Sequence, residues 1–268
     1  MMQTPTQSFS GESFYRRILD VLQAASVEFL VGGAVALRSH TGIERDTKDF
    51  DLMLRPRDVE RAMAVCQEAG FRAGYAFSHW IAKIHLGEHF IDLIYRAGNG
   101  LCEVDDAWFN AAGEAEVFGH IVRICPPEEM IWQKAYIMER ERFDGADIQH
   151  LLRAQAHAMD WNRLLERFRD DWQVLLSHLV LFGYIYPGER NSIPAAVIQS
   201  LMARLQDQLT QPPPDTRDCR GTLLSRAQYL PDVERWGYRD IRLEDRVKMT
   251  PEQMLEWTTA IDRGQRAR

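Results

Sequence analysis

A pair of glycines followed by two closely spaced aspartates constrains this chain more than any other feature. Gly32 and Gly33 follow the apolar residues 27–31, and Asp49 and Asp51 belong to a second apolar stretch, residues 49–54. Alternate residues of a strand point to the same face, about 6 to 7 Å apart, so the two carboxylates are expected to project together. Neighbouring carboxylates repel each other and lose hydration unless a cation lies between them. The pattern therefore predicts a divalent metal site.

A third carboxylate extends this predicted site. Asp92 lies within residues 90–94, which are otherwise apolar and read as a buried strand. An isolated buried charge is costly, so this aspartate needs a partner. If the two strands are neighbours, the carboxylates lie about 5 Å apart and suit one Mg²⁺ or Mn²⁺ ion, or two ions about 3.5 to 4 Å apart. The alternative is that Asp49 caps a turn while Asp92 pairs with an arginine.

The periodicity of apolar residues predicts a sheet first and helices afterwards. We expect strands over 27–31 and 49–54, helices over 12–25, 34–39 and 56–69, and two hairpins over 80–95 and 117–124. Helices are expected over 128–140, 145–156, 161–185 with a possible break, and 194–209. This is an α+β fold with a small mixed or antiparallel sheet flanked by helices and followed by an α-helical domain.

The chain is expected to divide into three parts. Residues 1–125 form the sheet domain, 126–210 the helical domain, and 211–268 a C-terminal extension that begins with a proline-rich linker. The extension is rich in aromatic residues, so we expect it to pack on the body, although its role does not follow from the sequence.

Composition narrows the class of protein. Hydrophobic residues make up 46% and charged residues 26%, as in ordinary globular proteins. The net charge of −7 argues against broad non-specific nucleic-acid binding but leaves room for a local basic patch. Four scattered cysteines predict neither a zinc site nor a disulfide framework. This cysteine pattern favours the reducing cytoplasm. The sequence also shows neither a signal peptide nor a stretch long enough to span a membrane.

The order of these motifs resembles a known superfamily. The Gly-Gly pair, Asp-x-Asp and a lone later aspartate, over residues 27–95, are similar to the DNA polymerase beta-type nucleotidyltransferases. The closer similarity is to bacterial nucleotidyltransferases of the abortive-infection toxin kind and their uncharacterised relatives. A second block resembles the helical Lys…Arg…Asp-x-x-Asp motif of those toxins and comprises Lys134, Arg140, Arg142, Asp144 and Asp147.

The resemblance implies an enzyme that transfers a nucleoside monophosphate from a triphosphate to an acceptor and releases pyrophosphate. Asp49 and Asp51 would bind the metals that carry the triphosphate, and Asp92 would complete the second metal and favour deprotonation of the acceptor hydroxyl. Backbone amides of the glycine pair would hold phosphates. Lys134 would neutralise the charge that develops toward pyrophosphate.

Several of these residues have a second interpretation. Arg45 and Thr47 either contact phosphates or the attacking substrate, or belong to a solvated loop. Lys134 either reaches the triphosphate or extends its ammonium group to water. Asp144 is placed to cap the helix that follows. The second block as a whole reads equally well as a salt-bridge cluster joining two domains.

Two further alternatives concern other residues and the role of the protein. His85 and His89 are placed as cross-strand neighbours but lack further ligands, so no zinc site is expected. The acceptor is RNA, a protein or a small molecule, and the sequence selects neither among these nor among the nucleotide bases. The alternatives to an enzyme acting alone are a nucleotide-binding regulatory module without transferase activity and the toxin of a toxin–antitoxin pair, which would add an antitoxin partner.

Overall fold

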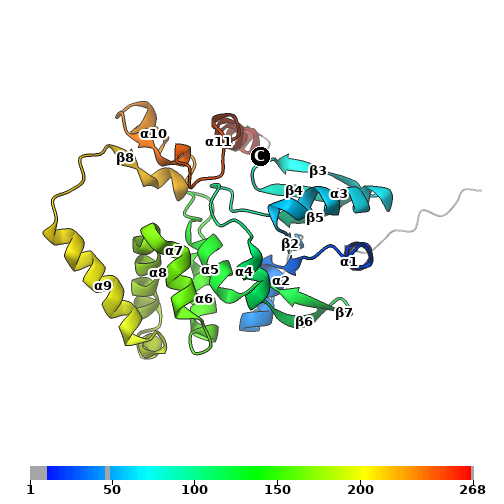
Figure 1. The fold of residues 1–268 in the computed structure, drawn as a ribbon, viewed down its shortest axis with the longest axis horizontal. Coiled ribbons are helices and arrows are strands. Elements are labelled where there is room, and N and C mark those ends of the chain that lie inside the picture. The colour runs from blue at the N-terminus through cyan, green and yellow to red at the C-terminus, as the bar shows by residue number, and fades with distance from the viewer. Residues whose placement is uncertain (1–10, 46–48, 267–268) are drawn as a thin grey trace, which may run out of the picture.

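A seven-stranded mixed sheet forms the centre of the molecule (Figure 1). The computed structural model describes residues 11–45 and 49–266, with side chains to residue 260. The strand order is β3-β4-β5-β2-β1-β7-β6. The strands are β1 (Leu30–Val31), β2 (Asp51–Met53), β3 (Arg72–Phe77), β4 (Ile81–Leu86), β5 (His89–Ile94), β6 (Gly113–Val117) and β7 (His120–Ile124).

The pairing of the strands makes the sheet mixed. β2 runs parallel to β5 and antiparallel to β1, and β1 runs parallel to β7. The outer pairs β3–β4, β4–β5 and β6–β7 are antiparallel. The predicted fold class is therefore confirmed, as are both predicted hairpins.

The two central strands are shorter than the sequence pattern predicts. β1 covers two residues and β2 three, because the chain leaves the sheet at the glycine pair and at Pro56. Asp49 consequently precedes β2 instead of lying within it. The prediction of one strand carrying both Asp49 and Asp51 is wrong in this respect.

Two helices cover one face of the sheet. α1 (Gly11–Ala24) buries Phe14, Ile18, Leu19 and Leu22 at helical spacing. α3 (Val59–Glu68), which follows the 3-10 turn η1 (Pro56–Asp58), packs on α1, β3 and β4. The apolar side chains of the β4–β5 hairpin point to this covered face, where Ala82, Ile84, Ile91 and Leu93 are fully buried.

The opposite side of the molecule holds most of the other helices (Figure 1). α2 packs on α6, which also contacts α5 and α8. These helices are α2 (Gly33–Thr41), α5 (Pro127–Ala135), α6 (Gly145–Gln155), α7 (Trp161–Phe168), α8 (Trp172–Ile185) and α9 (Ala195–Thr210). The 3-10 turn η2 (Arg169–Asp171) makes the expected break between α7 and α8, and η3 (Pro187–Ser192) separates α8 from α9.

Two local predictions differ from the structure. α5 ends at Ala135 rather than at residue 140, because residues 138 and 143 form a β-bridge that folds the chain into a loop. A short helix, α4 (Asp106–Ala111), was not anticipated; Asp105 caps it by accepting hydrogen bonds from the backbone N–H groups of Ala107 and Trp108. In the part of the chain that the structure describes, no helix is long and apolar enough to cross a membrane.

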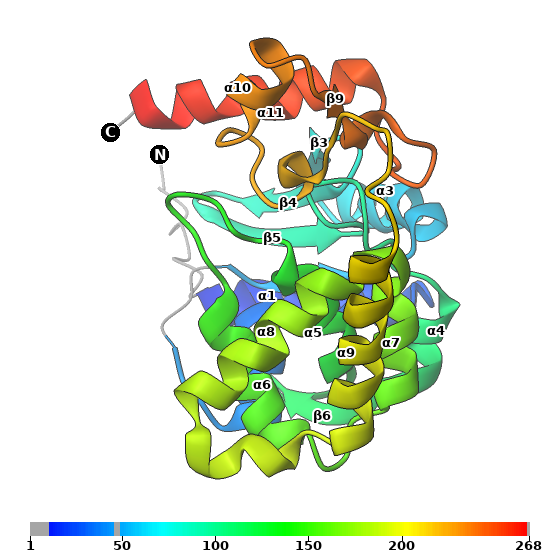
Figure 2. The ribbon, with the colours of Figure 1, turned by 90° about the vertical axis from the view of Figure 1, so that its left-hand side faces the viewer.

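The C-terminal extension contacts the sheet end of the molecule, where both views place α11 beside β3 and β4 (Figures 1 and 2). The side chain of Asn99 donates to the carbonyl of Leu223 at 2.8 Å. The rings of Trp257 and His79 are in a T-shaped contact with their centroids 5.8 Å apart. The elements of the extension are β8 (Asp218–Cys219), η4 (Arg220–Leu223), α10 (Leu230–Glu234), β9 (Arg239–Asp240), η5 (Ile241–Leu243) and α11 (Pro251–Arg266). The three domain boundaries remain a prediction.

Candidate active site

The glycine turn, two aspartates and a lysine lie in one row across four neighbouring strands. Asp51 on β2 is directly opposite Asp92 on β5, and Asp92 is opposite Lys83 on β4. On the other side of β2, the backbone N–H of Gly32 donates to the carbonyl of Asp51 at 2.9 Å. Side chains at directly paired positions of neighbouring strands lie on the same face of the sheet. The prediction that the strands of Asp51 and Asp92 are neighbours is thus confirmed.

Gly33 is fitted closely against Asp51. Its φ of +55° is unfavourable for any residue with a side chain, and an added Cβ would overlap Oδ2 of Asp51. A Cβ at Gly32 would overlap the Met53 methyl group in the same way. α2 begins immediately at Gly33. The N–H groups of its first turn have no partners within the helix, and such groups bind phosphate oxygens.

The carboxyl group of Asp51 is influenced by the charges of several neighbouring residues. Burial, followed by the negative charges of Asp92 and Asp49, raises the pKa of Asp51 to about 6. The positive charges of Lys134 and Arg142 oppose this rise. All three predicted carboxylates and two of the second-block cations therefore act on a single site.

Lys83 is the residue that the sequence analysis missed. Its ammonium group pairs with Oδ1 of Asp92, and Asp92 is only 8% exposed. Burial raises the pKa of Asp92, while the hydrogen bond and charge of Lys83 lower it. The alternative in which an arginine is the partner of Asp92 was wrong about the residue but right that the carboxylate has a cationic partner.

The second sequence block forms a salt-bridge cluster beside the aspartates. Lys134 Nζ lies 2.7 Å from Asp144 and 2.8 Å from Asp147, and Arg45 pairs with Asp147 from the end of the segment that precedes β2. Burial raises the pKa of Asp144, but hydrogen bonds and charge from Arg142 and Lys134 outweigh it and hold that pKa at about 2. Within the described residues Asp144 makes no capping hydrogen bond to α6, because its carboxylate accepts from these two cations.

The remaining predicted residues lie apart from this cluster. Asp49 is exposed just before β2, yet its charge acts on Asp51. Thr47 lies outside the described residues. His85 is opposite Phe90 rather than His89, and His89 stacks on Phe14 with ring centroids 6.1 Å apart. The proposed cross-strand histidine pair is therefore wrong.

The carboxylate groups of these aspartates are suitable ligands for a divalent cation. Among the described residues, however, they are not arranged as a complete metal site. Carboxylate oxygens are the ligands that Mg²⁺ prefers. Burial, followed by repulsion from Asp92 and Asp49, raises the pKa of Asp51, and a bound cation would offset both effects. Across residues 11–45 and 49–266, however, no three His, Cys, Asp or Glu side chains are already arranged to hold a metal ion.

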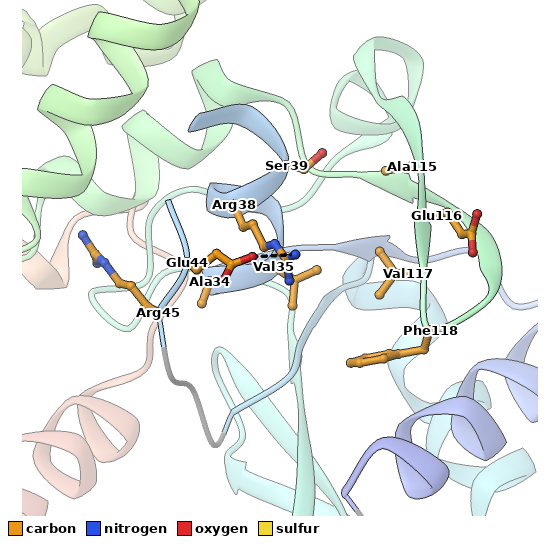
Figure 3. Close-up of a pocket in the computed structure, with 10 residues that line it drawn as sticks. All are labelled: Ala34, Val35, Arg38, Ser39, Glu44, Arg45, Ala115, Glu116, Val117 and Phe118. Carbon is orange, nitrogen blue, oxygen red and sulfur yellow. Dashed lines mark ion pairs between the residues drawn. The ribbon is translucent and has the colours of Figure 1, made fainter. Parts of the chain in front are cut away.

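A cavity of about 710 Å³ adjoins the start of α2 (Figure 3). α2 contributes one wall and the end of β6 the other, with Phe118 at the tip of the β6–β7 hairpin. The Phe118 ring lies 5.4 Å from that of Phe50, the residue before Asp51. The lining residues are Ala34, Val35, Arg38, Ser39, Glu44, Arg45, Ala115, Glu116, Val117 and Phe118.

This fold, with a glycine turn packed against one of two paired aspartates, is that of a nucleotidyltransferase. Residues 15–177 match the family described as uncharacterised nucleotidyltransferase, and the chain belongs to that family. The superfamily assignment made from the motifs is thereby confirmed, and the protein is an enzyme of the nucleotidyltransferase class. No curated protein matches this sequence.

Solved structures of nucleotidyltransferases are similar to this chain at low identity. The solution structure of the antibiotic-resistance factor ANT(2'')-Ia is 18% identical, covers 62% of this chain and 95% of its own, and has a TM-score of 0.43. An antigenic nucleotidyltransferase-like protein from Paracoccidioides brasiliensis is 15% identical, with coverage of 73% and 100% and a TM-score of 0.44. The lincomycin-bound lincosamide antibiotic adenylyltransferase LnuA is 16% identical, with coverage of 53% and 96% and a TM-score of 0.38.

Proposed function

We propose that this protein transfers a nucleoside monophosphate from a nucleoside triphosphate to an acceptor hydroxyl in a reaction that depends on Mg²⁺ or Mn²⁺. The observation that carries the proposal is the row in which Gly33 packs on Asp51 and Asp51 faces Asp92. In this row the start of α2, to which we assign phosphate binding, lies beside two carboxylates. Bound to Asp49, Asp51 and Asp92, the divalent ions would neutralise phosphate charge and lower the pKa of the acceptor hydroxyl.

The triphosphate is assigned to the α2 side of the row. The N–H groups at the start of α2 donate to its oxygens, and Lys134 and Arg142, whose charges already act on Asp51, offset its negative charge. The cavity begins at Ala34 and Val35, directly after the glycine turn. Its volume of about 710 Å³ accommodates the sugar and base of a nucleotide whose phosphates lie at that turn.

The acceptor is assigned to the Asp92 side of the row. The acceptor oxygen forms a bond to the α-phosphorus while the bond from that phosphorus to the α–β bridging oxygen breaks. Pyrophosphate leaves with the electron pair, and the hydroxyl proton passes to Asp92 or to water. Most of the rate enhancement comes from positioning and from stabilisation of charge, as in other phosphoryl transfers.

Transfer of label tests the proposal. Each of the four α-labelled nucleoside triphosphates is incubated with Mg²⁺, total cellular RNA and cell lysate, with wild type or with Asp49→Ala/Asp51→Ala. Label on RNA, protein or a small molecule with the wild type alone establishes the transfer. If metal-dependent triphosphate binding occurs and no acceptor is labelled, the protein is a regulatory module instead. A toxin role with an antitoxin partner rests only on the sequence resemblance, and growth arrest that Asp51→Ala relieves would support it.

A further inference from the structure

The row of site residues continues into an open face of the sheet on the side away from the glycine turn. Antiparallel pairing places Lys83 opposite Asp92 and Gly74, and His85 opposite Phe90 and Arg72. These residues share one side of the sheet, because the alternate positions of β4 and β5 are buried and α1 and α3 pack on the other side of β3, β4 and β5. We name this surface the β3–β5 face, consisting of Arg72, Gly74, Lys83, His85 and Phe90.

The β3–β5 face is accessible. Arg72 and Gly74 are exposed, and Lys83, His85 and Phe90 are partly exposed. A Cβ built at Gly74 meets nothing within 4 Å among the described residues, so the edge strand β3 is uncovered at this position. A ligand whose reacting end lies at Asp92 can therefore extend across β4 to β3.

The chemistry of this face is cationic and aromatic. Lys83 Nζ lies 4.1 Å from the centre of the Phe90 ring, and the His85 ring is 6.0 Å from it. Burial and the charges of Lys83 and Arg72 lower the pKa of His85, so this side chain presents a neutral ring near pH 7. Beside Asp92, the face offers two cations and two rings.

Resting on the proposed function, we infer that the acceptor is the 3′ end of a single-stranded nucleic acid, held on the β3–β5 face with its terminal hydroxyl at Asp92. Arg72 and Lys83 contact backbone phosphates, and Phe90 and His85 stack on bases. Single-strand binding sites combine these two elements, a cationic path and aromatic rings. A polycationic aminosugar would instead meet like charges here. The overall charge of −7 is no obstacle, because Arg72 and Lys83 place two positive charges on this face.

Binding of oligonucleotides to the full-length protein tests the inference. Fluorescence anisotropy is measured with 5′-labelled single-stranded RNA and DNA of about 12 nucleotides, a length within the range of known single-strand sites. The variants are Arg72→Glu and Phe90→Ala, with Phe90→Leu if the alanine variant does not fold. Arg190→Glu, an exposed charge reversal on η3, is the matched control. Lys83 is left intact because it contacts Asp92.

We expect Arg72→Glu and Phe90→Ala each to weaken binding roughly tenfold or more, the latter because a base no longer stacks on the ring. The dependence of affinity on salt should also fall in Arg72→Glu, by about 0.7 in log–log slope for each phosphate that the variant no longer binds. Arg190→Glu should bind like the wild type. The RNA and DNA arms show which nucleic acid is preferred. The enzyme should extend the oligonucleotide with an α-labelled triphosphate. An oligonucleotide with a blocked 3′ hydroxyl should bind without being extended.

Binding of the triphosphate with Mg²⁺ is measured in parallel and separates the two proposals. If the triphosphate binds but no oligonucleotide does, or if both face variants bind oligonucleotides normally, the acceptor inference is wrong and the proposed function stands. Label on an aminosugar in preference to the oligonucleotide likewise overturns it. If the oligonucleotide binds through the β3–β5 face but no triphosphate binds, the surface is supported and the proposed transfer fails.

Discussion

At the scale of single residues, Gly33 connects backbone conformation to the candidate chemistry. Its position combines a φ of +55° with direct contact between the backbone and the Asp51 carboxylate. Gly42, at the other end of α2, has a φ of +72° but nothing within 4 Å of an added Cβ among the described residues. The two glycines of one helix therefore share the backbone requirement and differ in what a methyl group would displace.

We expect Gly33→Ala to abolish nucleotide transfer and Gly42→Ala to leave it nearly unchanged. Both variants place a side chain in the left-handed region and should lose about 1–2 kcal/mol of folding free energy. Only the methyl group at Gly33 would displace Asp51. Urea unfolding gives the first quantity and label transfer the second. Equal activities in two folded variants would show that the position of Asp51 is not critical.

At the scale of elements, the sequence predicts the framework of the sheet but not its edge strand. The paired turn residues Gly87 and Glu88 define the β4–β5 hairpin, and counting back from them places Lys83 opposite Asp92, so this partner was accessible from the sequence. β3 was missed because two alanines and a glycine give it a weak strand pattern, and none of its residues is buried. α4 was missed because it is six residues long, too short to show a helical period in the sequence.

The site residues likewise include some that the sequence predicts and some whose contacts it does not. Local spacing predicts Asp51, Asp92 and the glycine turn, since each lies on or beside a short element with a strong pattern. The partners of Lys134 depend on where α5 ends and how the chain loops back to α6, which the sequence pattern placed several residues too late. Contacts of that kind follow from tertiary packing and have no local signature.

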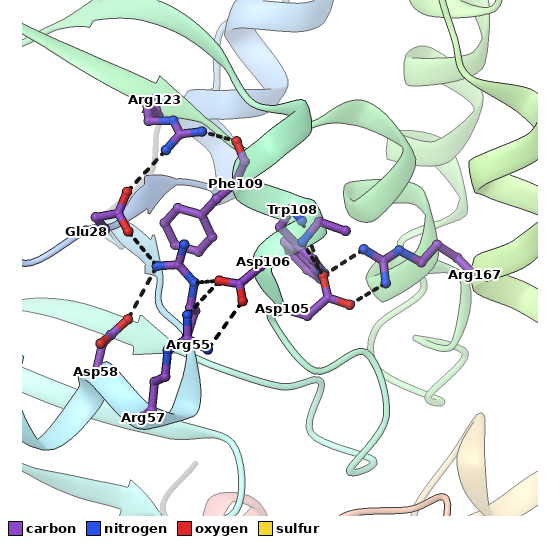
Figure 4. A network of polar contacts seen from close by, with 11 residues as sticks. Glu28, Arg55, Arg57, Asp58, Asp105, Asp106, Trp108, Phe109, Arg123 and Arg167 are labelled. Carbon is purple, nitrogen blue, oxygen red and sulfur yellow. Dashed lines mark hydrogen bonds and ion pairs between the residues drawn. The ribbon is translucent and has the colours of Figure 1, made fainter.

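The junction between β2 and α4 depends on Arg55 (Figure 4). This residue is 7% exposed, its guanidinium group lies 3.6 Å above the centre of the Phe109 ring, and it pairs with Glu28, Asp58 and Asp106. A lysine can reproduce neither the stacking nor the forked hydrogen bonds. This junction therefore depends on the guanidinium group itself and not only on a positive charge.

Arg55→Lys should lower the free energy of unfolding by about 1–3 kcal/mol, the scale of a hydrogen bond to a charged group. Arg57→Lys is the control, because Arg57 pairs with the same Asp106 but its side chain is 64% exposed, where an ion pair contributes about 0–1 kcal/mol. Urea unfolding of both variants measures the difference. If the two lose equal stability, the burial of Arg55 has no energetic role.

At the scale of the whole molecule, buried polar contacts join the C-terminal extension to the body. Asp171, at the break between α7 and α8, accepts hydrogen bonds from Tyr136 at 2.9 Å and from Arg246 of the extension at 2.7 Å. At the sheet end, His79 Nε2 donates to the carbonyl of Gly98 at 3.0 Å, and Trp257 of α11 packs on the same imidazole. Since His79 is 1% exposed, its protonation state should be linked to the stability of the folded molecule.

Burial lowers the pKa of His79 to about 4, with the Gly98 hydrogen bond opposing the shift and the charge of Arg96 adding to it. The unfolded chain takes up this proton near pH 6.5, so between about pH 6.5 and 4 it binds more protons than the folded protein. The stability associated with His79 is therefore complete above pH 6.5 and declines as the pH falls through this window, by at most about 3 kcal/mol.

His79→Gln removes the titrating group and keeps an N–H donor for the Gly98 carbonyl. We expect the variant to lose less stability than the wild type between about pH 7 and about pH 4.5, with a difference of roughly 2 kcal/mol. Urea unfolding at the two pH values measures this difference, and other groups that titrate equally in both proteins cancel in the comparison. Parallel losses of stability would mean that the folded protein accepts a proton on His79 as readily as the unfolded chain does.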